Sequence, residues 1–155
     1  MSKFSSNVKD ESGATVVTLS GIIDEDVDFS QFPISGKPAV RLKLSGIKSI
    51  NSCGIREWIK WITANTGKIE LVECPKVIVD QVNMVDGFLP QNATVSSFYV
   101  PYYNDDSGSE KNVLYTFGKE YNQSGLVQAP AVKDEDGNEM EMDVVEAKYF
   151  KFLRK

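Results

Sequence analysis

The chain has 155 residues, of which 41% are hydrophobic and 25% charged, as is typical of a globular protein with one domain and a small second module. The net charge of −5 without a Lys/Arg cluster disfavours a nucleic-acid surface, and the lack of histidine removes the commonest general base and metal ligand. No stretch is apolar enough for a membrane span, nothing resembles a signal peptide, and the two cysteines fit a reducing compartment, so we expect a cytoplasmic, non-enzymatic protein without metal or cofactor.

The first third of the chain predicts a flexible segment, a strand and an acidic connection. Residues 1–13 are polar and are expected to be flexible. Residues 14–19 are rich in β-branched side chains, which predicts a strand. Residues 22–38 form the connection, in which three apolar side chains are expected to anchor a short helical turn: Phe29, Phe32 and Ile34.

The turn at residues 51–54 joins a predicted strand to a predicted helix. Apolar and charged residues alternate over residues 40–44, the pattern of a half-buried strand. From residue 55 the apolar side chains recur at helical spacing, so Asn51 and Ser52 fall where a helix N-cap belongs. Open N–H groups and the helix dipole at this end also favour an anion or phosphate. A purely structural cap is the competing interpretation.

Strands and helices continue to alternate beyond this turn. Residues 68–72 predict a strand, residues 75–86 a helix, and residues 94–100 another strand. This alternation indicates an α/β fold with helices packed on one sheet.

Three segments carry a resemblance to a known family. Residues 19–24 are similar to a strand-ending Gly-x-x-Asp motif, residues 42–54 to the signature Asp-Leu-Ser-Gly-Val…Asp-Ser-Ser/Thr-Gly, and residues 74–88 to the last helix of that family. On these segments, residues 14–98 resemble a STAS domain, the fold of anti-sigma factor antagonists. The resemblance implies a bacterial signalling module that docks a protein partner, either a kinase or an anti-sigma-like regulator.

The resemblance also implies a switch and a docking surface. In such antagonists the partner kinase phosphorylates the serine of the signature, which maps onto Ser52. This chain departs from the signature in having Asn before that serine and Cys after it. The implied surface comprises the turn and the helix side that follows it: Asn51, Ser52, Cys53, Gly54, Arg56, Lys60 and Trp61. Trp61 lies off the apolar stripe, which fits either partner contact or packing beneath the second module.

Residues 99–155 are interpreted as that second module, a small β-ribbon. Two polar turns, each followed by glycine, place four residues at the spacing of zinc-ribbon cysteines: Asn104, Ser107, Lys133 and Asp136. Because these residues cannot form a soft tetrahedral site, we expect a degenerate, metal-free ribbon held together by its many aromatic side chains. A calcium site over residues 134–138 is an alternative, but its spacing departs from the known loop.

Two other functions compete with partner docking. The helix N-terminus at residue 51 would hold a small anionic ligand or nucleotide, with the tail as a lid. Alternatively, the protein would be a structural subunit that forms homodimers through its aromatic tail. Ligand-induced thermal stabilisation would indicate the first of these, and concentration-dependent oligomerisation alone would indicate the second.

Overall fold

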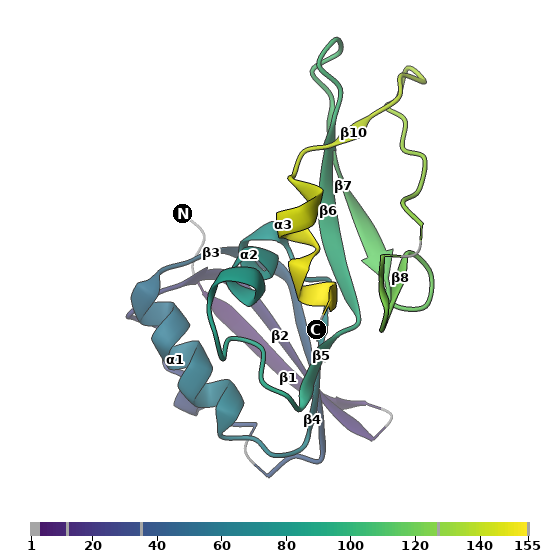
Figure 1. The fold of residues 1–155 in the computed structure, drawn as a ribbon. Coiled ribbons are helices and arrows are strands. Elements are labelled where there is room, and N and C mark those ends of the chain that lie inside the picture. Colours follow the sequence, from purple (N-terminus) through teal and green to yellow (C-terminus); the bar gives the residue numbers. More distant parts are fainter. Residues whose placement is uncertain (1–3, 12, 35, 127, 155) are drawn as a thin grey trace.

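The computed structural model describes residues 4–11, 13–34, 36–126 and 128–154, and its main element is a five-stranded sheet. The strands of this sheet are β1 (Ser5–Glu11), β2 (Ala14–Ile23), β3 (Ala39–Ile50), β4 (Lys68–Val72) and β5 (Ala93–Val95). They lie in chain order across the sheet, with β1 antiparallel to β2 and all later neighbours parallel. This sheet and the helices packed on it confirm the predicted α/β class (Figure 1).

Strand β1 corrects the expectation that residues 1–13 are flexible, but only for residues 5–11, because residues 1–3 and 12 lie outside the described residues. Its residues pair with β2 along the whole strand, from Ser5 opposite Ser20 to Glu11 opposite Ala14. All seven side chains of this edge strand are exposed, so its sequence carries no apolar alternation that would have indicated a strand. Backbone pairing with β2 forms the strand instead.

The connections between the parallel strands all lie on one face of the sheet. They contain η1 (Phe29–Gln31), α1 (Ser52–Thr63) and α2 (Lys76–Met84). Because each connection steps one strand in the same direction, right-handed crossovers place all three on the same side, where Figure 1 shows α1 and α2. Apolar residues in register face these helices, including Val17, Leu42 and Leu71.

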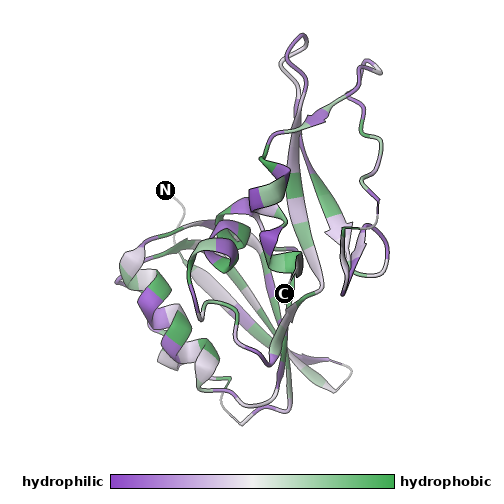
Figure 2. Ribbon diagram, viewed as in Figure 1, coloured by the Kyte–Doolittle hydropathy of each residue, from purple (hydrophilic) through white to green (hydrophobic). Residues whose placement is uncertain are grey.

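The chain then leaves the main sheet and forms an elongated ribbon. The ribbon consists of β6 (Ser97–Tyr103), β7 (Glu110–Thr116) and β10 (Glu141–Met142) in the order β10-β6-β7, beside a hairpin of β8 (Tyr121–Asn122) and β9 (Gly125–Leu126). The strand predicted over residues 94–100 is therefore two strands in two different sheets. Figure 2 shows apolar and polar residues alternating along β6. Phe98 on the apolar side of this strand is the centre of an aromatic cluster that includes Tyr121 and Phe152.

The end of the chain differs from the all-β tail that its sequence predicts. It forms a helix, α3 (Glu146–Tyr149), followed by the turn η2 (Lys151–Arg154). Tyr149, Phe150 and Phe152 are buried, and their rings contact Phe98. The Phe150 ring also contacts those of Tyr115 and Tyr149, which confirms the predicted packing of the tail aromatics on one another. The helix itself was missed because four residues are too few to give a periodic signal.

Candidate functional site

The 51–54 turn lies at the carboxyl edge of the parallel sheet. Asn51 directly follows β3, and its backbone N–H donates to the carbonyl oxygen of Ile23, the last residue of β2, over 3.1 Å. In open α/β sheets, ligand sites lie outside the carboxyl ends of the strands. The turn therefore lies on the side of the sheet where such sites form.

The predicted N-cap is confirmed, and the capping residue is Asn51. Its Oδ1 accepts from the backbone N–H of Gly54 over 2.8 Å, while its Nδ2 donates to Oε2 of Glu25 over 3.0 Å. Chiefly through this Asn51 hydrogen bond, the pKa of Glu25 is held below its usual value. A negative charge thus sits beside the helix N-terminus, which disfavours a small anion there.

Ser52 and Gly54 have opposite surroundings within the same turn. Ser52 is the first residue of α1 and is exposed, and Cys53 beside it is half-buried. Gly54 is buried, because the first turn of α1 lies directly on the end of β2. A Cβ at Gly54 would lie 2.5 Å from the carbonyl oxygen of Ile23, so only glycine permits this approach.

The exposed side of α1 carries most of the other predicted surface residues. Arg56 and Lys60 are exposed, and Nζ of Lys60 lies 3.3 Å from Oε2 of Glu57. The expected positions of Trp61, in contact with a partner or beneath the second module, are both wrong. Only 7% of its surface is exposed. Its Nε1 donates to the carbonyl oxygen of Phe32 over 3.1 Å, so it packs beneath the η1 connection and neither faces solvent nor lies under the ribbon.

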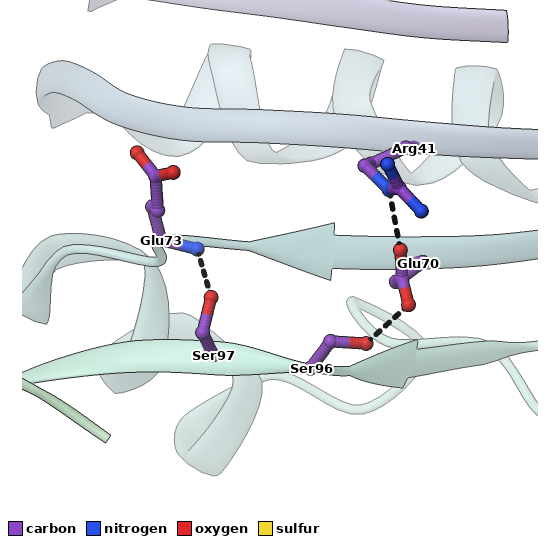
Figure 3. Close-up of polar contacts among 5 residues, drawn as sticks. All are labelled: Arg41, Glu70, Glu73, Ser96 and Ser97. Atoms are coloured by element: carbon purple, nitrogen blue, oxygen red, sulfur yellow. Dashed lines mark hydrogen bonds and ion pairs between the residues drawn. The ribbon is translucent and has the colours of Figure 1, made fainter. Parts of the chain in front are cut away.

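A polar row that the sequence analysis missed crosses the opposite face of the sheet (Figure 3). Arg41 Nε lies 2.6 Å from Oε1 of Glu70, and Ser96 Oγ donates to Oε2 of Glu70 over 2.7 Å. Burial raises the pKa of Glu70, but the bonds from Ser96 and Arg41 outweigh it and hold this pKa below its usual value. These residues are far apart in sequence, and only the register of β3 with β4 would have revealed the Arg41–Glu70 pair.

The four predicted zinc-ribbon positions lie in two turns that hydrogen bonds join. Ser107 Oγ donates to Oδ2 of Asp134 over 2.7 Å, and Asn104 Nδ2 donates to the carbonyl oxygen of Glu139 over 2.7 Å. The carbonyl oxygen of Lys133 accepts from Lys111 Nζ over 2.6 Å. The side chains that link the turns are therefore those of Asn104, Ser107 and Asp134, of which the sequence analysis did not single out Asp134 for this role. Descent from a zinc ribbon stays a prediction.

Asp134 is buried, and both of its carboxylate oxygens accept hydrogen bonds. Oδ1 accepts from the backbone N–H groups of Asp136 and Asn138, and Oδ2 accepts from Ser107 and from Nδ2 of Asn138. These bonds, that of Ser107 foremost, lower the pKa of Asp134 to about 2. A carboxylate that is already surrounded by donors is poorly placed to bind calcium.

We expect Asp134→Ala to loosen the ribbon tip while Asp136→Ala leaves it intact, because Asp136 contributes only its backbone N–H. Amide hydrogen exchange over residues 104–109 and 133–139 should accelerate in the first variant alone. In the wild type the same amides should lose protection as pH falls from about 4 towards 2, since a carboxylate with a depressed folded-state pKa stabilises only while it is ionised. Equal exchange in both variants would contradict this role for Asp134.

Comparisons with known proteins give a likeness to part of the fold. No protein-family model matches the chain, and no curated protein matches it. One similar solved structure is that of an anti-sigma factor antagonist from Mycobacterium paratuberculosis, with 19% identity and a TM-score of 0.38 over 48% of this chain and 71% of that chain. A likeness at this level carries no argument about function.

Two other features are absent from the described residues, a cluster of metal ligands and a membrane-spanning helix. No three or more His, Cys, Asp or Glu side chains in this part of the chain are grouped so as to hold a metal ion. None of the helices found there has the length and apolarity needed to cross a membrane.

Proposed function

We propose that the protein is a non-enzymatic, STAS-like signalling module of the cytoplasm that docks a protein partner through the 51–54 turn and the exposed side of α1. The observation that carries the proposal is the exposure of Ser52 at the start of α1, on the carboxyl edge of the sheet. The Asn51 side chain caps the helix through the backbone N–H of Gly54 and so closes the turn that carries this serine. Arg56 and Lys60 extend the same surface along the helix.

A phosphate on Ser52 would act as an electrostatic switch for this surface. Glu25 already places a carboxylate beside the turn, and a phosphoserine would add about −1.5 to −2 charges to it. A partner that docks on the unmodified turn would then meet both a larger side chain and like-charge repulsion. The same Glu25 carboxylate is the reason to prefer protein docking to a small anionic ligand.

We expect Ser52→Asp to lose the partner. Wild-type protein, Ser52→Asp and the control Ser124→Asp, which changes an exposed serine on the ribbon hairpin, would be used side by side as bait in the native lysate. A partner identified by mass spectrometry should bind wild type and Ser124→Asp equally and Ser52→Asp at least about tenfold more weakly. Partners shared by all three baits, or no partner at all, would overturn the proposal.

Phosphorylation is tested separately from docking. The protein would be incubated with the same lysate and ATP, and its phosphorylated residues would be located by mass spectrometry, with Ser52→Ala as the control. Phosphate at Ser52 would establish the switch. If docking depends on Ser52 but no phosphate is found there, the docking proposal stands and the proposed switch by a kinase is wrong.

A further inference from the structure

A groove between α2 and α3 lies apart from the 51–54 turn. Its volume is about 610 Å³, and residues from both helices and from the segment between β10 and α3 line it. No residue of the turn or of α1 belongs to this lining. The groove, called the α2–α3 groove below, thus joins the sheet domain to the end of the chain.

Hydrogen bonds of Asn83 and Tyr149 connect the walls of the α2–α3 groove to each other and to β6. Asn83, near the end of α2, donates from Nδ2 to the carbonyl oxygen of Tyr149 over 2.9 Å and accepts at Oδ1 from the backbone N–H of Phe152 over 2.9 Å. The Tyr149 hydroxyl donates in turn to the carbonyl oxygen of Tyr99 in β6. Walls that are already joined by hydrogen bonds need less ordering when a ligand fills the groove between them.

The two most exposed large apolar side chains among the described residues line this one groove. Met84 is 71% exposed and Val145 is 63% exposed. Apolar side chains that gather on an exposed concave surface indicate an interaction site more strongly than scattered ones do. Methionine is also well suited to adapt its shape to a partner side chain.

The residues that line the α2–α3 groove carry a net positive charge, although the whole protein is negative. Three lysines, Lys76, Lys148 and Lys151, and two aspartates, Asp80 and Asp143, line the groove, whereas the chain carries a net charge of −5. Lys76 Nζ is neutralised by Asp80 at 2.7 Å. Within the described part of the chain, the Lys148 and Lys151 ammonium groups form no ion pair, which leaves these two cations and the single carboxylate of Asp143 as the unpaired charges of the lining.

We propose that the α2–α3 groove is a second docking site, which binds an acidic segment of a partner protein. Apolar side chains of this segment would cover Met84 and Val145, and its carboxylates would pair with Lys148 and Lys151. The apolar contact supplies affinity, and the lysines select against basic segments. This proposal is independent of docking at the 51–54 turn.

The test is a selection from displayed random peptides of about 15 residues, long enough to form a helix in the groove. Wild-type protein is the target, and a groove variant with Met84→Asp, Lys148→Glu and Lys151→Glu is the counter-target. The matched control variant makes the same three changes at exposed positions elsewhere: Leu114→Asp, Lys37→Glu and Lys119→Glu. Enriched peptides are then synthesised with a fluorescent label and titrated by anisotropy.

The proposal predicts enriched peptides that combine leucine, isoleucine or phenylalanine with aspartate and glutamate. The groove variant should bind them at least about tenfold more weakly than wild type and the control variant do, and salt should weaken the binding. The single variant Lys148→Glu should weaken it in the same direction, which keeps the test valid if the triple variant folds poorly. No enriched peptide, peptides without acidic residues, or equal binding to wild type and Lys148→Glu would overturn the proposal.

Discussion

Trp58→Ala is expected to lower the free energy of unfolding by about 3 to 5 kcal/mol, the range for removing a large aromatic side chain from a core. The Trp58 side chain is fully buried in α1 and stacks on Phe88, with ring centroids 4.8 Å apart. Its Nε1 donates to the carbonyl oxygen of Phe88 over 3.1 Å. The substitution therefore opens a cavity between α1 and the segment after α2 and leaves a buried carbonyl without its donor.

Urea unfolding followed by circular dichroism measures this loss. Because the loss approaches the whole stability of a small domain, Trp58→Phe is measured in parallel. Trp58→Phe keeps a stacked ring but not the indole N–H, and we expect it to lower the free energy of unfolding by less than Trp58→Ala does. Leu114→Ala, at an exposed position on β7, should change the free energy of unfolding by less than about 0.5 kcal/mol. A Trp58→Ala value near that of Leu114→Ala would contradict the packing described here.

Gly54→Ala is expected to destabilise the protein by about 1 to 3 kcal/mol, although the same change in an open helix stabilises by roughly 1 kcal/mol. The added Cβ would meet the Ile23 carbonyl oxygen at 2.5 Å and its Cγ2 at 2.9 Å. Backbone atoms at the end of β2 cannot move aside cheaply, so the start of α1 must shift. The sign of the effect distinguishes this close approach from simple helix propensity.

Thermal and urea unfolding of Gly54→Ala would be compared with those of Ser52→Ala, two residues earlier in the same turn. Ser52 is exposed and does not supply the cap, so its truncation should leave stability within about 0.5 kcal/mol of wild type. A Gly54→Ala variant that is as stable as wild type, or more stable, would show that α1 does not need its observed approach to β2.

Local patterns in the sequence predict the α/β part of this fold well. The alternation in β3, the helical spacing in α1 and the capping role of Asn51 are all properties of neighbouring residues. The burial of Phe29, Phe32 and Ile34 in the connection before β3 is confirmed as well.

The missed features depend on contacts between distant segments. Strand β1 has no apolar side to reveal it and exists through its pairing with β2. Trp61 lies off the apolar stripe of α1 and is buried only because the η1 connection folds over it. Asp134 likewise gains its role from Ser107, 27 residues earlier in the chain. None of these contacts has a short-range signal in the sequence.

Site-specific photocrosslinking tests the docking proposal most directly. A benzophenone side chain would replace Lys60, on the exposed side of α1, or Lys119, an exposed residue after β7, and the cells of origin would be irradiated. Our account predicts that the position-60 probe crosslinks one partner protein, that the position-119 probe does not, and that adding Ser52→Asp removes the crosslink. A crosslink that persists with Ser52→Asp, or none at position 60, would contradict docking at the 51–54 turn.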